Sequence, residues 1–323
     1  MTWRSGIGRA ALDCFAFARN DGRKDRIVNA SLATLVDDLK REPSRTGSLV
    51  VTVFGDAIVP RGGSVWLGTL LEFFALLDVD SGGVRTAMSR LAADGWLERR
   101  RVGRNSFYRL ADKGRTRFDA AMRHVYDPPP SGPLEMLLLP GARDSAKNAL
   151  RSAGFGTPLP GVWIAPAGAS STLDQPDAIR LTIDATTADA RKLVAASWDF
   201  AEMAAAYRVF IARFEPLRRS LAGKRDLPDA QAFVARILLV NAYRRVSLRD
   251  PLLPPDMLPP DWPGGTARAL CRAIFHALLP ASERWLAANG VNEDGPLPPA
   301  SPDLAGRFAG RHITKNTCER ELL

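Results

Sequence analysis

The chain has 323 residues, and its 44 Lys and Arg against 35 Asp and Glu give a net charge of +9. At about 100–200 residues per domain this length indicates two or three domains, and a content of 46% hydrophobic and 24% charged residues excludes global disorder. The positive charge favours an anionic partner. Composition alone does not distinguish nucleic acid, an anionic membrane face and a phosphorylated ligand.

Cysteine spacing and hydropathy exclude several classes of protein. Cys14, Cys271 and Cys318 are far apart in the sequence, so we expect neither a disulfide framework nor a zinc site. No apolar run approaches the ~20 residues of a membrane span. Asp13 interrupts the apolar stretch near the start, Ala10–Ala18, and Arg19 ends it, which makes it a poor signal peptide. The sequence therefore predicts a cytoplasmic protein with no membrane partner, no metal and no cofactor.

The first segment, residues 1–46, is expected to be an N-terminal extension. Its apolar residues between Ile27 and Leu39 follow helical spacing and predict one amphipathic helix.

The next segment, residues 47–127, has the layout of a winged helix-turn-helix. A compact apolar stretch, Ser48–Ile58, precedes an apolar helix predicted over Val65–Leu77. A third helix is predicted from about Gly82 to Asp94, with Ser81 as its N-cap. The order helix, helix, helix, β-hairpin, helix is that of a DNA-binding winged helix.

The third of these helices has two contrasting faces. Apolar residues recur at i, i+3, i+4 and i+7, namely Val84, Ala87, Met88 and Leu91. The opposite face carries hydrogen-bond donors: Arg85, Thr86, Ser89 and Arg90. A recognition helix needs both, because it docks on its own domain and reads base edges in the major groove.

The hairpin that follows concentrates positive charge. Strands are predicted over Leu97–Val102 and Ser106–Leu110, and a helix over Asp112–Tyr126. Residues 97–117 carry eight positive and two negative side chains, a net +6. The wing residues expected to contact phosphates or the minor groove are Arg99, Arg101, Arg104 and Asn105. The alternative to DNA binding is that these arginines form a solvated face of the winged-helix module, and that the module binds an acidic protein.

Residues 131–199 are predicted to form an α+β domain. The order β-α-β-β-α suggests a ferredoxin-like unit, with strands at Leu134–Leu139, Val162–Ala165 and Ile179–Ile183 and helices at Asp144–Ala153 and Ala188–Trp198. Leu139-Pro140-Gly141 follows the first strand without the carboxylate that a metal-dependent nuclease of this fold would need.

Residues 200–323 are predicted to be helical, with helices over Ala201–Leu221, Asp229–Val246, Ala267–Leu279 and Ala281–Asn289. The second helix ends with Arg244, Arg245 and Arg249, beside a Pro-rich stretch that contains Trp262. One explanation for the three arginines is that cations are favourable at a helix C-terminus. The other is that they bind a phosphorylated effector. Trp262 would then either anchor the Pro-rich stretch or line the effector pocket.

Four stretches of the sequence resemble the PaaX family of bacterial transcriptional repressors: TVFGDAIVPRGGSVWLGTLL, VRTAMSRLAADGWLERRRVGRNSFYRL, PGVWIAP and AYRRVSLRDPLLPPDMLPPDWPGG. The resemblance covers about residues 46–286 and leaves residues 1–45 outside. It implies an α+β multidomain protein with a winged-helix domain, a Cas2-like ferredoxin-like middle domain and a helical C-terminal domain.

The same resemblance implies a function. Members are homodimers that bind double-stranded operator DNA, repress aromatic catabolic genes, and are released by an aryl-CoA thioester such as phenylacetyl-CoA. The sequence leaves open a PaaX-like regulator that answers to a different aromatic effector. A hydrolase of nucleic acid or of acyl thioesters is the alternative from another class, but the catalytic motifs of such enzymes are missing. We therefore expect a regulator and not an enzyme.

Overall fold

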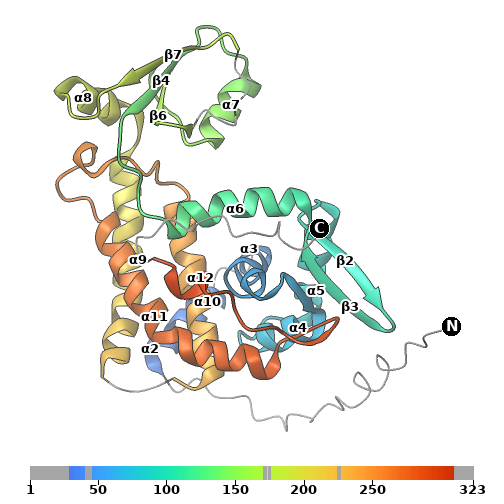
Figure 1. Ribbon diagram of the computed structural model, residues 1–323. Helices are drawn as coiled ribbons and strands as arrows, with labels where there is room; N and C mark the ends of the chain where they lie inside the picture. Colours follow the sequence, from blue (N-terminus) through green and yellow to red (C-terminus); the bar gives the residue numbers. More distant parts are fainter. Residues whose placement is uncertain (1–28, 41–45, 170–172, 174–175, 224–226, 309–323) are drawn as a thin grey trace, which may run out of the picture. The chain divides into compact units, whose positions relative to one another are not determined.

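The computed structural model describes residues 29–40, 46–169, 173, 176–223 and 227–308. In this part of the chain helices combine with small antiparallel sheets, so the predicted α+β class is confirmed. The chain folds into two compact units (Figure 1). Of the described residues, the first unit contains 29–40, 46–119, 216–223, 227–241 and 273–305, and the second contains 120–169, 173, 176–215, 242–272 and 306–308. The limits of these units differ from the domain boundaries expected from the sequence at residues 46, 127 and 199, because the long C-terminal helices contribute residues to both units.

The first unit begins with helices α2 (Ala30–Lys40) and α3 (Thr46–Val53). The helix predicted from Ile27 is confirmed from Ala30 onward, and the rest of the predicted extension, residues 1–28 and 41–45, lies outside the described residues. A π-helical turn (Phe54–Ile58) and a short 3-10 turn (Val59–Arg61) continue α3.

Strand β1 (Ser64–Trp66) replaces the beginning of the helix predicted over Val65–Leu77, so that prediction is wrong at its start. Helix α4 covers only Leu67–Ala75. The local pattern is helical, but β1 pairs with β3 (Asn105–Leu110) and this tertiary contact prevails. Strand β2 (Leu97–Val102) pairs on the other side of β3, which confirms the predicted hairpin and gives the sheet order β1-β3-β2.

Helix α5 (Ser81–Ala93) is capped by Asp80 and not by the predicted Ser81. The Asp80 carboxylate accepts hydrogen bonds from the backbone N–H groups of Gly82 (2.8 Å) and Gly83 (3.1 Å). A carboxylate suits this position because it also meets the positive end of the helix dipole. After the helix, Gly95 adopts a φ of 73°, as a glycine beyond a helix C-terminus commonly does.

Helix α6 (Asp112–Tyr126) has the predicted bounds. Its Phe118 ring lies against Gly55 in the π-helical turn, where a Cβ on residue 55 would be only 2.0 Å from the ring. Any side chain at position 55 would therefore displace Phe118, so this close approach requires glycine.

Three long helices follow: α9 (Phe200–Ala222), α10 (Asp229–Ser247) and α11 (Gly264–Asn289). The last was predicted as two helices separated by Pro280, and that prediction is wrong. Leu278 and Leu286, on either side of the proline, are 1% and 0% exposed. Packing of this face keeps the helix continuous although proline lacks the N–H of an internal hydrogen bond.

A four-stranded antiparallel sheet lies in the second unit. Its spatial order is β5 (Gly156–Leu159), β6 (Val162–Pro166), β4 (Leu134–Leu138) and β7 (Ile179–Ile183). Three of these strands were predicted, but β5 was missed, because the sequence Gly-Thr-Pro-Leu carries two residues that strands disfavour.

The two faces of this sheet carry separate cores. Leu137 and Trp163 pack with Leu150 of α7 (Asp144–Ser152). On the opposite face, Leu134 and Ile164 pack with residues of α8 (Ala188–Ser197).

Short elements complete the described chain: a 3-10 turn (Pro255–Met257), strands β8 (Val291–Asn292) and β9 (Gly295–Pro296), and helix α12 (Asp303–Gly306). Among the described helices, none combines the length and the apolar character that a membrane crossing needs.

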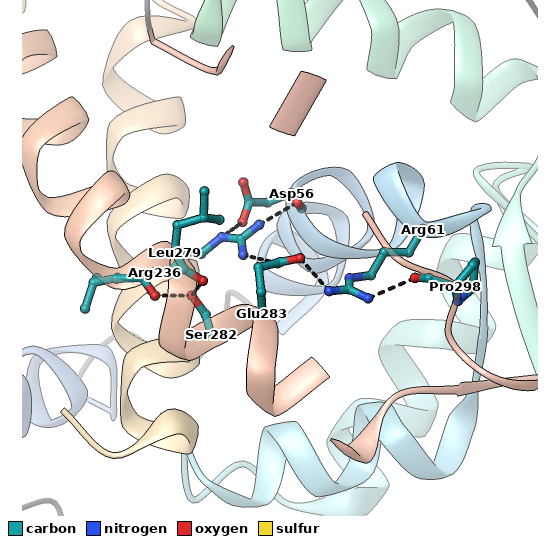
Figure 2. Close-up of polar contacts among 8 residues, drawn as sticks. Asp56, Arg61, Arg236, Leu279, Ser282, Glu283 and Pro298 are labelled. Carbon is teal, nitrogen blue, oxygen red and sulfur yellow. Dashed lines mark hydrogen bonds and ion pairs between the residues drawn. The ribbon is translucent and has the colours of Figure 1, made fainter. Parts of the chain in front are cut away.

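An ion network fills the interior of the first unit (Figure 2). The Arg236 side chain of α10 is fully buried, and its Nε lies 2.6 Å from Oδ2 of Asp56, itself 1% exposed. Arg236 Nη1 donates to Glu283 of α11 (2.7 Å), and Nη2 donates to the backbone carbonyl of Asp56 (2.9 Å). The Arg236 guanidinium also lies over the Phe275 ring, 5.1 Å from its centroid.

Glu283 extends this network to a second arginine. Its other oxygen accepts a hydrogen bond from Arg61 (2.5 Å), and Arg61 donates in turn to the backbone carbonyl of Pro298 (2.9 Å). Two guanidiniums and two carboxylates therefore neutralise one another. They connect the turn after α3, helix α10, helix α11 and the segment after β9.

Replacing Arg236 by alanine should lower the free energy of unfolding by ~3–5 kcal/mol, because Asp56 would be left as an uncompensated buried charge. Urea denaturation followed by tryptophan fluorescence measures this change. Arg284→Ala is the matched control: its pair with Asp229 is exposed (63% and 40%), so its loss should cost ~1 kcal/mol or less. Equal effects of the two substitutions would contradict the role given to the buried network.

Candidate nucleic-acid interface and ligand cavity

Helix α5 separates apolar and polar residues as its sequence predicted. Val84 and Met88 are fully buried and Ala87 is 8% exposed. All four predicted contact residues on the opposite face are exposed: Arg85, Thr86, Ser89 and Arg90. The Thr86 hydroxyl donates to the Gly82 carbonyl (2.9 Å). Among the described residues, no ion pair holds Arg85 or Arg90, so both guanidiniums are available to an anionic partner.

The predicted wing residues lie on the adjacent hairpin, whose strand β2 packs next to α5. Arg99 donates to the Ser106 hydroxyl (3.2 and 2.9 Å), and Arg101 Nε donates to the Gly103 carbonyl (3.2 Å). Arg104, at the hairpin tip, is exposed, whereas Asn105 is half-buried at the start of β3. Arg99 and Arg101 are therefore held along the strand, while Arg104 extends from the turn.

Two other cations of the hairpin are paired with carboxylates. Arg109 donates to Glu98 on the neighbouring strand (2.8 Å), and this hydrogen bond and the charge of Glu98 raise the pKa of Arg109. Arg100 lies 3.7 Å from Glu293, which also accepts a hydrogen bond from Ser64 (2.5 Å). The charge count of the sequence therefore overstates how many arginines a polyanion would meet.

The second unit contains a cavity of about 360 Å³. The Pro-rich stretch, the first turn of α11 and the facing sides of α9 and α10 line it. Its aromatic and charged lining consists of Tyr207, Tyr243, Asp250, Trp262 and Arg268. The Trp262 ring meets Phe200 and Tyr207 edge to face, with centroids 5.6 and 5.7 Å apart. A cavity with ring surfaces and a few convergent polar groups suits a flat apolar group that carries a polar end.

The polar groups of the cavity wall are fixed in place. Tyr207 donates to Asp250 Oδ2 (2.8 Å), and Asp250 Oδ1 accepts from the Leu252 amide (2.8 Å), which holds Leu252 at a φ of 52°. Burial raises the pKa of the Asp250 carboxyl, whereas these hydrogen bonds lower it. Burial also raises the pKa of the Tyr207 hydroxyl, which therefore stays protonated.

Arg268 is the cation of this wall, and sequence reasoning missed it. Its guanidinium donates to the backbone carbonyls of Val125 (3.2 Å) and Tyr126 (2.5 Å), and its charge acts to lower the pKa of the Tyr243 hydroxyl against the larger, raising effect of burial. A single arginine near the start of a long helix gives no signal in the sequence that separates it from a solvated side chain.

Of the predicted effector residues, only Trp262 lines the cavity. Arg244 is half-buried, and burial lowers the pKa of its guanidinium. Arg245 is also half-buried. Arg249 is exposed and lies 3.9 Å from Glu202. The three arginines thus differ in exposure and do not join Trp262 in the lining.

Within the ranges that the structure describes, no group of three His, Cys, Asp or Glu side chains is arranged to hold a metal ion.

The family models and known relatives point to one family. The model described as PaaX-like protein matches residues 45–114, and the model described as PaaX-like protein C-terminal domain matches residues 198–288. The transcriptional repressor PaaX of Escherichia coli strain K12 is 34% identical over 287 residues, which cover 82% of this chain and 90% of that protein. That relative is a transcriptional repressor by name, in agreement with the expected regulator.

Among solved structures, the uncharacterized protein Rv0674 from Mycobacterium tuberculosis is 26% identical. The match covers 66% of this chain and 88% of that chain, with a TM-score of 0.42. The identity and coverage shared with the Escherichia coli repressor, together with the two matching models, show that this chain belongs to the PaaX family.

Proposed function

We propose that this chain is a DNA-binding transcriptional repressor of an aromatic catabolic operon of the phenylacetate type. One observation carries the proposal: α5 docks by its apolar face and exposes two arginines and two hydroxyls on the other, next to a basic hairpin. The name of the Escherichia coli relative, a transcriptional repressor, supports it.

The arrangement of the first unit supports a winged helix-turn-helix, with α5 as recognition helix in the major groove and the β2–β3 hairpin as wing. In the second unit, the antiparallel strand order β5-β6-β4-β7 supports the Cas2-like, ferredoxin-like prediction for the middle segment. A repressor of this kind works in the cytoplasm, where its operator is.

Two copies would bind one operator. Two recognition helices related by a two-fold axis fit half-sites about one helical turn, ~34–36 Å, apart. A pseudo-palindromic operator between promoter and gene would then block transcription while it is occupied.

The cavity of the second unit is the proposed effector site. Its aromatic walls suit the ring of an aryl-CoA thioester such as phenylacetyl-CoA, and its volume of about 360 Å³ suits the acyl end of that molecule. The CoA phosphates would stay outside, where Arg244, Arg245 and Arg249 remain candidates to meet them. The effector can release DNA only by binding more tightly to the state that does not fit the operator.

Replacing Arg85 by alanine should weaken operator binding by ~1–3 kcal/mol, a factor of about 5 to 150, and relax the preference at one base pair. Titration of a labelled operator measures the affinity, and a panel of single base changes maps the position. Arg109→Ala is the matched control, since Glu98 already occupies that guanidinium. Unchanged affinity of Arg85→Ala would argue against α5 as the reading helix.

Replacing Arg104 by alanine should flatten the dependence of binding on salt, because each phosphate contact contributes about 0.9 to the slope of log affinity against log salt. The measurement is the same titration at several salt concentrations. Removal of Arg109 should change the slope less. If both variants keep the slope of the parent chain, the hairpin does not contact the DNA backbone.

The effector site is tested by Trp262→Ala, which removes a ring from the cavity wall. We expect phenylacetyl-CoA to bind this variant at least about tenfold more weakly by calorimetry, while operator affinity without ligand stays unchanged. Val209→Ala, at an exposed position of α9 outside the cavity lining, is the control. Arg249→Ala reports separately on a phosphate contact. Retained binding in Trp262→Ala would place the effector elsewhere.

A further inference from the structure

The hydroxyl of Thr86 is already used within α5. It donates to the backbone carbonyl of Gly82, one turn earlier in the helix (2.9 Å). A hydroxyl carries a single hydrogen, so Thr86 has no donor left for a base, although its place on the polar face predicts one. The same bond fixes the rotamer of the side chain. The group that Thr86 offers to a partner is therefore its methyl group.

The residues around Thr86 leave this methyl group open. Side chains of a helix lean towards its N-terminus, and the neighbours of Thr86 on that side, four and three residues earlier, are Gly82 and Gly83. Neither glycine has a side chain that could cover the methyl group, and all three residues are exposed.

Packing within the described chain does not explain Gly83. A Cβ at Gly82 would lie 2.7 Å from Oδ2 of Asp80, so the cap of α5 restricts that position. A Cβ at Gly83, by contrast, would meet no described atom within 4 Å, and the backbone there is helical. Glycine weakens a helix relative to alanine. The open space beside Thr86 is accounted for by a partner that approaches the first turn of α5 closely.

A methyl group on this face has one counterpart in the major groove. Among the base edges exposed there, thymine alone presents an apolar group, its 5-methyl, and the methyl group of a threonine is a suitable contact for it. Arg85 and Arg90, which share the exposed face of α5 with Thr86, suit the acceptors of guanine and of phosphate instead.

We propose that Thr86 is a specificity-determining residue, which reads a thymine by contact between its own methyl group and the 5-methyl group of the base. The inference rests on the proposed function, since it requires α5 to enter the major groove. It adds that the Thr86 hydroxyl takes no part in recognition, and that the space beside Gly83 admits the edge of the base.

The DNA probe for the test is the duplex that the parent chain enriches most from a pool of random sequences. Its thymines are replaced one at a time by deoxyuridine, which keeps the base pair but lacks the 5-methyl group. At one position in each half-site, the parent chain should lose affinity about fourfold, the effect of one methyl-sized apolar contact. Titration of the labelled duplexes measures each affinity.

Two substitutions separate the methyl group of Thr86 from its hydroxyl. Thr86→Ser removes the methyl group. It should bind the unmodified duplex about fourfold more weakly per half-site and become indifferent to deoxyuridine at that position. Thr86→Val removes the hydroxyl, and should keep both the affinity and the deoxyuridine sensitivity of the parent chain.

Thr34→Ser is the matched control. The exposed Thr34 of α2 makes the same kind of bond, to the backbone carbonyl of Ala30 (3.1 Å), so the control loses an equivalent methyl group outside α5. It should bind every duplex as the parent chain does. Circular dichroism checks that each variant keeps its fold.

Weak binding by Thr86→Val together with unchanged binding by Thr86→Ser would assign recognition to the hydroxyl and overturn the inference. A duplex without any position at which Thr86→Ser cancels the deoxyuridine effect would overturn it as well. Both results leave the proposed function standing, because the chain still selects a sequence. A pool from which the parent chain enriches no sequence would reject the repressor function itself, and the inference with it.

Discussion

The burial of the Arg236 guanidinium is the constraint on which the first unit depends. An arginine that is fully removed from water is tolerable only when carboxylates and carbonyls surround it. Asp56 supplies both groups from a π-helical turn, and Glu283 supplies a second carboxylate from α11. Apolar packing alone would accept several positions of these elements, whereas a charge that must meet two fixed partners accepts few. Because the loss of one partner would leave a buried charge unpaired, the π-helical turn, α10 and α11 have to keep their positions together.

The candidate DNA-binding surface is built on this constrained interior. The turn with Asp56 leads directly to Arg61, β1 and α4, and β1 pairs with the strand that carries one side of the hairpin. Glu293, in the β8–β9 turn, also contacts the sheet through Ser64 and Arg100. Residues from the C-terminal third of the chain thus help to orient the hairpin, so the first unit is more than an N-terminal domain with a linker.

Features that depend on local sequence were predictable. The two faces of α5, the β2–β3 hairpin and α6 all follow from periodicity and turn residues close in the chain. Features that depend on distant partners were not: β1 is a strand only because β3 lies beside it, and α11 continues through Pro280 only because its flanks are packed. The cavity illustrates the same limit. Trp262 attracts notice in a Pro-rich stretch, but Arg268 acquires its partners from residues more than a hundred positions earlier.

The ion network also has a consequence for the order in which the protein is made. Asp56 leaves the ribosome long before its partners, since 227 residues separate it from Glu283. At about 5–20 residues per second, synthesis of that span takes roughly 10–45 seconds. For most of this interval, until Arg236 is made 180 positions after Asp56, the carboxylate of the N-terminal segment has no arginine to neutralise it. Until Glu283 is made, Arg236 lacks its second carboxylate, and the network stays incomplete. A nascent or prematurely terminated chain therefore lacks the finished first unit, and a repressor of this design becomes competent only when almost all of it has been translated.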